Sequence, residues 1–140
     1  MKPRYRVIDH TSDIGLEAEG DTLGEAFVHA AEGMFDILSD GSRVASRTSL
    51  PVAVDGTDPG ELLVNYLGEL LYLFEVHGVL FGEFTVRITG SGERWELMGE
   101  ALGEPMDPAK HNYPLEIKAV TYHLLEVRED PPFVRVIFDL

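Results

Sequence analysis

Cysteine is absent from all 140 positions of the sequence. This absence excludes disulfide bonds, thiolate nucleophiles and every metal site that depends on sulfur ligands. A metal ion bound by this chain must therefore be held by oxygen atoms or by histidine nitrogens.

Basic residues are also scarce, with 11 lysines and arginines against 25 aspartates and glutamates, which gives a formal net charge of −14. A surface this negative repels the phosphate backbone of nucleic acids, so we expect no direct nucleic-acid binding. The same field attracts cations and basic protein surfaces, although an acidic surface that only maintains solubility is the commoner explanation. The charge thus argues against nucleic-acid partners but does not identify a protein partner.

Long apolar runs and catalytic motifs are missing as well. The most continuous apolar stretch, 62–81, contains an asparagine, two glutamates and a histidine, which argues against a membrane span. Residues 1–6 are polar and precede no apolar signal-peptide core, so a cytoplasmic location is expected. The sequence has no Gly-rich phosphate loop, no nucleophile elbow and no His-Glu-x-x-His helix.

Hydrophobic periodicity predicts two helices and several short strands. The first helix follows the capping-box pair Thr22 and Glu25, and the second begins at Asp58 and ends at Gly78. Strands are expected at 4–9, 14–19, 50–55, 84–88, 95–102, 115–127 and 133–140, with a loop at 105–114. The predicted fold is therefore α+β, a single two-layer domain over residues 1–140 in which two main helices pack on a largely antiparallel β-sheet.

Two aspartates stand next to apolar segments and are the first candidates for a site. Asp13 lies between two apolar strands, and Asp139 lies in the apolar strand 133–140. If the fold joins them, Asp139, the Leu140 carbonyl and the terminal carboxylate offer several hard oxygen ligands, which suit Ca²⁺ or Mg²⁺. Spacing alone favours a plainer explanation, in which Asp13 caps a turn and Asp139 is a solvated terminal residue.

Lys118 and the histidines are weaker candidates. A lysine in a strand usually faces solvent, but near a carboxylate cluster Lys118 would pair with that cluster or meet a phosphate. His10 and His123 reach a shared site only if the fold brings their strands together, and no two histidines have metal-ligand spacing on one element. The helical residues His29 and His77 are expected at the surface.

Four stretches of the sequence, taken together, resemble the archease family. They are His10-Thr11-Ser12-Asp13-Ile14-Gly15, Ala30-Ala31-Glu32-Gly33-Met34-Phe35-Asp36, the segment 116–123, and Val136-Ile137-Phe138-Asp139-Leu140. The first stretch has Ser12 where the family usually has alanine, a small change that leaves Asp13 in place.

The resemblance implies an accessory protein for an RtcB-type tRNA-splicing RNA ligase, which promotes guanylylation of the ligase, widens its nucleotide use and catalyses no reaction itself. It also implies a divalent cation, Ca²⁺ in the first place with Mg²⁺ and Mn²⁺ as alternatives, held by Asp13, Asp139 and Leu140. Lys118 matches a family position tied to activity, and we assign it, with His10, as a contact to the ligase or nucleotide rather than as a ligand.

The acidic composition fits this role, because a negative helper can approach the basic groove of an RNA ligase without competing for RNA. Two alternatives from other classes remain. In the first, the chain is a chaperone-like adaptor with a structural metal ion. In the second, which the sequence supports less, it is a stand-alone metal-dependent hydrolase. The sequence does not specify the oligomeric state.

Overall fold

The computed structural model describes residues 4–9, 12–113 and 115–140 of the chain. The strands are β1 (Tyr5–Asp9), β2 (Asp13–Glu19), β3 (Thr48–Gly56), β4 (Val79–Ser91), β5 (Arg94–Pro105), β6 (Ala119–Glu129) and β7 (Pro132–Asp139). The helices are α1 (Leu23–Ser39) and α2 (Pro59–His77). No helix of the described part of the chain is long and apolar enough to cross a membrane.

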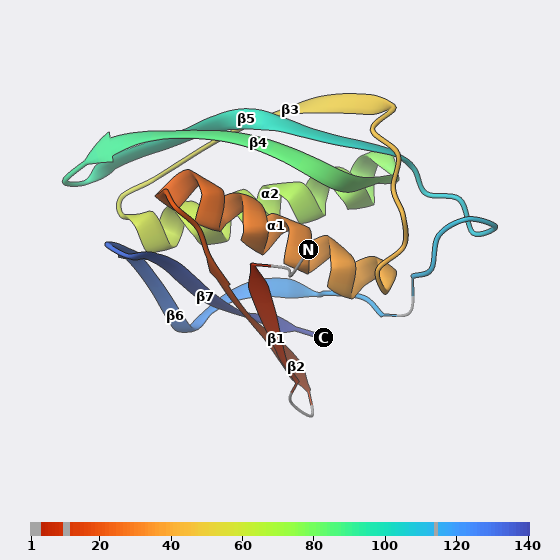
Figure 1. Ribbon diagram of the computed structural model, residues 1–140, viewed down its shortest axis with the longest axis horizontal. Coiled ribbons are helices and arrows are strands. Elements are labelled where there is room, and N and C mark those ends of the chain that lie inside the picture. The colour runs from red at the N-terminus through yellow and green to blue at the C-terminus, as the bar shows by residue number, and fades with distance from the viewer. Residues whose placement is uncertain (1–3, 10–11, 114) are drawn as a thin grey trace.

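The strands form two antiparallel sheets, and the helices lie between them (Figure 1). One sheet has the order β1-β2-β7-β6, and the other has the order β3-β5-β4. The predicted α+β class, with two helices on antiparallel strands, is confirmed, but the two-layer description is corrected to three layers. The physical reason is that each helix is apolar on two sides, since α1 packs on both β2 and β4, and α2 packs on both β3 and β6.

Side-chain caps fix both helix starts as the sequence predicted. The Glu25 backbone N–H donates to Thr22 Oγ1 at 3.1 Å before α1, and the Glu61 N–H donates to Asp58 Oδ1 at 2.8 Å before α2. Gly78 ends α2 with a positive φ of 66°, a conformation that favours glycine. These caps set where each helix enters the space between the sheets.

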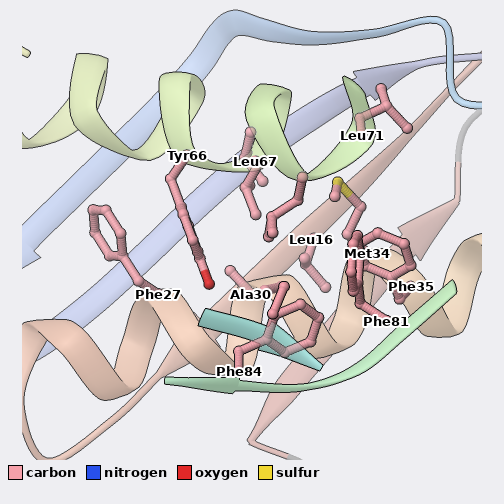
Figure 2. Close-up of a cluster of buried hydrophobic side chains, with 14 of the residues drawn as sticks. Leu16, Phe27, Ala30, Met34, Phe35, Tyr66, Leu67, Leu71, Phe81 and Phe84 are labelled. Atoms are coloured by element: carbon pink, nitrogen blue, oxygen red, sulfur yellow. The ribbon is translucent and has the colours of Figure 1, made fainter. Parts of the chain in front are cut away.

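Aromatic side chains fill the space around α1. The Phe35 ring meets the rings of Phe81 and Phe84 on β4, with centroids 5.5 Å and 5.8 Å away, and Figure 2 shows this group beside Met34. Phe27 of α1 stacks on Tyr66 of α2 at 6.1 Å. The core therefore joins both sheets through the helices.

The strand predicted at 115–127 differs from β6 in two ways. β6 begins only at Ala119, because Ala119 pairs with Asp139, the last residue of β7, and the residues before it have no strand to pair with. The ladder is also interrupted: Thr121 pairs with Ile137 and Glu126 with Arg135. Residues 122–125 thus form a bulge in β6, which is one of the two edge strands of the four-stranded sheet.

Candidate metal centre

Asp13 and Asp139 stand directly opposite each other on β2 and β7. The Leu140 backbone N–H donates to the Ser12 carbonyl at 3.4 Å, which makes Ser12 and Leu140 the hydrogen-bonded pair. By alternation, Asp13 and Asp139 form a non-hydrogen-bonded pair, in which Cα atoms are about 4.5 Å apart and side chains lie closest. The fold therefore places two carboxylates and residue 140 at one end of the sheet.

The environment of Asp13 favours a cation. Ile14, Leu16 and Ala18 are buried against the helices, so the alternation of β2 turns Asp13 to the other face of the sheet. Its Oδ1 atom is nevertheless buried and has no hydrogen-bond partner among the described residues. A buried carboxylate oxygen without a partner and a second carboxylate directly opposite are both unfavourable, and one bound cation would relieve both.

The donor set consists of hard oxygen atoms, which fits Ca²⁺ or Mg²⁺. Among the described residues, no three acidic or histidine side chains gather at metal-binding distance. The two carboxylates would therefore need oxygens from Leu140 or from the main chain to complete a coordination sphere. The geometry fits a cation held partly by backbone oxygens.

Lys118 is adjacent to this pair of carboxylates. It lies just before β6 rather than inside a strand as predicted, and its backbone N–H donates to the Asp139 carbonyl at 2.8 Å. Its side chain is exposed. His123 lies in the β6 bulge, where its N–H donates to Thr121 Oγ1 at 3.3 Å. His10 lies outside the described residues.

A row of ion pairs crosses the same sheet and joins its arginines to glutamates. Glu17 binds Arg6 at 2.5 Å and Arg135 at 4.0 Å, and Glu126 binds Arg135 at 3.2 Å and Arg128 at 2.6 Å. These guanidinium groups already have carboxylate partners. This row of ion pairs therefore offers no free basic stripe for a phosphate backbone.

A second charged cluster was missed by the sequence analysis. Glu104 is almost fully buried, and its carboxylate accepts hydrogen bonds from the Ala45 N–H at 2.6 Å, from Lys110 Nζ at 2.9 Å and from His111 Nε2 at 3.1 Å. The Ala45 N–H and then Lys110 hold the pKa of Glu104 down at about 2. In the sequence, Glu104 follows a predicted apolar strand and His111 lies in a predicted loop, and neither position indicates that the two side chains meet.

This second cluster is structural, because its groups satisfy one another. The Asp107 N–H donates to His111 Nδ1 at 2.9 Å, which leaves the ring proton on Nε2 to face Glu104. The Asn112 N–H donates to Ser42 Oγ at 2.8 Å. The cluster therefore fastens the loop after β5 to the segment before β3.

Comparison with known proteins gives one consistent match. The model of the Archease protein family matches residues 5–140. Protein archease of Pyrococcus furiosus is 39% identical over 123 residues, which cover 88% of this chain and 87% of that protein. Protein archease of Methanopyrus kandleri is 38% identical over 131 residues, covering 93% and 94%.

A solved structure agrees with these relatives. The solution structure of Methanobacterium thermoautotrophicum protein 1598 is 33% identical and matches with a TM-score of 0.84, covering 99% of this chain and 100% of that one. Neither the family name nor the names of the relatives state a catalysed reaction.

Proposed function

The chain belongs to the archease family, and from this premise we propose that it is a metal-carrying accessory protein of an RtcB-type tRNA-splicing RNA ligase. In this proposal it promotes guanylylation and turnover of the ligase, catalyses no reaction of its own and works in the cytoplasm. Its resident cation is Ca²⁺, with Mg²⁺ and Mn²⁺ as alternatives.

The single observation that carries the proposal is the pairing of Asp13 with Asp139, with Asp13 Oδ1 buried and without a partner among the described residues. Asp13, Asp139 and Leu140 would hold the cation. When bound, the cation supplies a positive charge between two opposed carboxylates and links β2 to β7.

Charge supports a protein partner over a nucleic acid. The net charge of −14 opposes an RNA backbone and favours a basic protein surface. The side chain of Lys118 is exposed and forms no ion pair within the described part of the chain, and its backbone N–H donates to the Asp139 carbonyl. Its compact positive charge suits a contact with the ligase or with its bound nucleotide.

The proposal is tested by a ligation assay under multiple-turnover conditions with the cognate ligase. Sub-stoichiometric protein should raise the rate, and Asp13→Asn should abolish the increase. The matched control is Asp55→Asn, which makes the same chemical change at an exposed position of β3. An unchanged rate at every ratio of protein to ligase would contradict the proposal.

The same variants separate the alternatives. Full stimulation by Asp13→Asn, despite loss of metal binding, would favour a chaperone-like adaptor with a structural metal ion. Phosphoesterase activity that survives repurification and disappears in Asp13→Asn would favour a stand-alone hydrolase. In either case the proposed metal-carrying helper would be wrong.

A further inference from the structure

The bulge of β6 exposes two large apolar side chains. Tyr122 is 58% exposed and Leu124 is 57% exposed, although both belong to an element of a sheet. β6 is at the rim of the four-stranded sheet, where only β7 pairs with it (Figure 1). Large apolar side chains that are held together at the surface can mark a binding site.

The bulge is a built conformation rather than a frayed edge. Thr121 Oγ1 donates to the Ile137 carbonyl at 2.9 Å, and Arg135 Nε donates to the Leu124 carbonyl at 2.9 Å. On its inner side the bulge packs on the first turn of α2, because a Cβ atom added at Gly60 would come within 3.0 Å of Leu125 Cδ2. These contacts fix the direction in which Tyr122 and Leu124 point.

This conformation is unfavourable for the isolated chain. Leu124 has a positive φ of 53°, which is strained for a residue with a side chain. The extra residues also interrupt the ladder to β7. The inward packing comes from Leu125, so exposing Tyr122 and Leu124 adds nothing to the core. Strain and bulges of this kind concentrate at functional surfaces.

We infer that Tyr122 and Leu124 dock into an apolar depression with a basic rim on the partner ligase; this inference rests on the proposed function. The bulge starts three residues after Ala119, the partner of Asp139, which is roughly 10 Å along the strand. A partner surface that covers the carboxylate pair therefore reaches the bulge as well. The basic rim follows from the net charge of −14.

Other occupants fit less well. A second copy of this chain carries the same negative charge, and the bulge breaks the flat edge that strand-to-strand pairing needs. RNA would meet the same negative field, and the nearby Arg128 and Arg135 are already paired with Glu126. A basic protein surface is the occupant that satisfies both the charge and the shape.

The chain contains a closely matched control surface. Tyr72 and Val76 of α2 are 56% and 57% exposed, almost the same as the bulge pair. They lie one turn apart on a regular helix with no backbone strain. They test whether any exposed pair of a tyrosine and an aliphatic residue is enough for binding to the ligase.

The test compares two double variants. The bulge double variant carries both Tyr122→Ser and Leu124→Ser, and the helix double variant carries both Tyr72→Ser and Val76→Ser. Affinity for the purified ligase is measured by biolayer interferometry in Ca²⁺, and the Ca²⁺-dependent shift in Tm is measured in parallel. The bulge double variant should bind at least about tenfold more weakly, as expected for truncated anchor residues. The helix double variant should bind as the wild type does, and both should keep the full metal-dependent shift.

Leu124→Gly separates docking from folding. Glycine accepts the positive φ without strain, so this variant should melt no lower than the wild type while binding the ligase more weakly. Weaker binding that is accompanied by a lost metal-dependent shift would assign the effect to the metal centre and overturn the inference.

The remaining outcomes are also decisive. Equal losses of ligase affinity in the two double variants would overturn docking by the bulge. Binding of a short RNA by the wild type that the bulge double variant loses would overturn it as well. Wild-type affinity in the bulge variant, with stimulation by the wild-type protein intact, would overturn the inference and leave the proposed function standing. A wild-type protein that neither binds nor stimulates the ligase would overturn both.

Discussion

At the residue scale, we expect the opposed carboxylates of Asp13 and Asp139 to make the stability of the fold depend on a divalent cation. Binding to the folded state alone stabilises it by roughly 2.7 kcal/mol at a hundredfold excess over the dissociation constant, which is several degrees in Tm for a chain of this length. Thermal melting with increasing Ca²⁺ should show this shift in the wild type and in Asp55→Asn. Asp13→Asn, Asp139→Asn and a chain extended past Leu140 should lose most of it. A full shift in both Asn variants at the site would place the metal elsewhere.

Lys118 offers a test in which stability and function separate. Its side chain is exposed, so Lys118→Ala should unfold at a urea concentration close to that of the wild type. Stimulation of the ligase should nevertheless fall, because the proposed contact of this positive charge with the ligase or its nucleotide is lost. Arg94→Ala, which removes an exposed positive charge from β5, is the control and should stimulate normally. Normal stimulation by Lys118→Ala would leave this lysine as a simple solvent-facing residue.

Tyr66 carries a buried hydroxyl group that does not hold the core together. The hydroxyl has no hydrogen-bond partner among the described residues, and Figure 2 shows it pointing from α2 toward α1 near Ala30. Burial raises the pKa of this phenol. Because Tyr66→Phe removes a buried polar group and keeps the ring, the free energy of unfolding in urea should stay equal or rise by up to about 2 kcal/mol.

The contrast for this prediction is Tyr5, whose hydroxyl donates to Asp36 and so links β1 to α1. Tyr5→Phe should lower the free energy of unfolding by about 1 kcal/mol, since it removes one partner of a made hydrogen bond. If Tyr66→Phe were the more destabilising of the two, its hydroxyl would have a partner such as a buried water.

At the scale of elements, two helical glycines should respond to alanine with opposite signs. Gly68 lies inside α2, and a Cβ atom added there meets nothing within 4 Å. Gly68→Ala should therefore raise the free energy of unfolding by about 1 kcal/mol, the difference in helix propensity. At Gly33 of α1 the added Cβ would be 2.7 Å from Cδ1 of the fully buried Leu16, so Gly33→Ala should destabilise. Chemical denaturation of both variants measures the difference, and equal signs would contradict the packing.

The loop after β5 should give the fold part of its sensitivity to acid. The pKa of Glu104 is lowered from 4.5 to about 2, so its stabilising contribution is complete above about pH 4.5 and is lost as the pH falls toward 2. Glu104→Gln should be less stable than the wild type at neutral pH, and the gap should narrow through this window. The control is Glu96→Gln, an exposed glutamate of the same strand, which should follow the wild-type profile in pH-dependent urea unfolding. A gap of constant size would show that the charge of Glu104 is not what matters.

At the scale of the whole molecule, local signals in the sequence predicted the elements but not their partners. The caps at Thr22 and Asp58 and the apolar periodicity behind them are properties of neighbouring residues, and both helices formed as expected. The division of the strands into two sheets depends on which strands pair, and alternation within one strand carries no information about this. The bulge in β6 was missed for the same reason, because it exists only relative to β7.

The candidate site shows the same limit. Between Asp13 and Asp139 lie 125 residues, and spacing alone left a turn cap and a solvated terminal residue as adequate explanations. The resemblance to the archease family indicated that Asp13 and Asp139 belong together. The register of β2 with β7 places the two side chains on one face of the sheet. Glu104 and His111 had no such likeness to identify them, and their contact emerged only from the folded loop.

The position of β7 between β2 and β6 also has a consequence for the order in which the chain is made and folds. The register joins Ile14 to Phe138, 124 residues further along the chain, so a nascent β1–β2 hairpin keeps one open edge for roughly ten seconds of synthesis. The strands of the other sheet and both helices are complete by Pro105, well before that edge is covered. Closure of such a distant pairing carries a large loop entropy and is slow. The pairing of Asp13 with Asp139 is thus among the last contacts of the molecule to form, so a cation at this pair would bind only to a chain that is already largely folded.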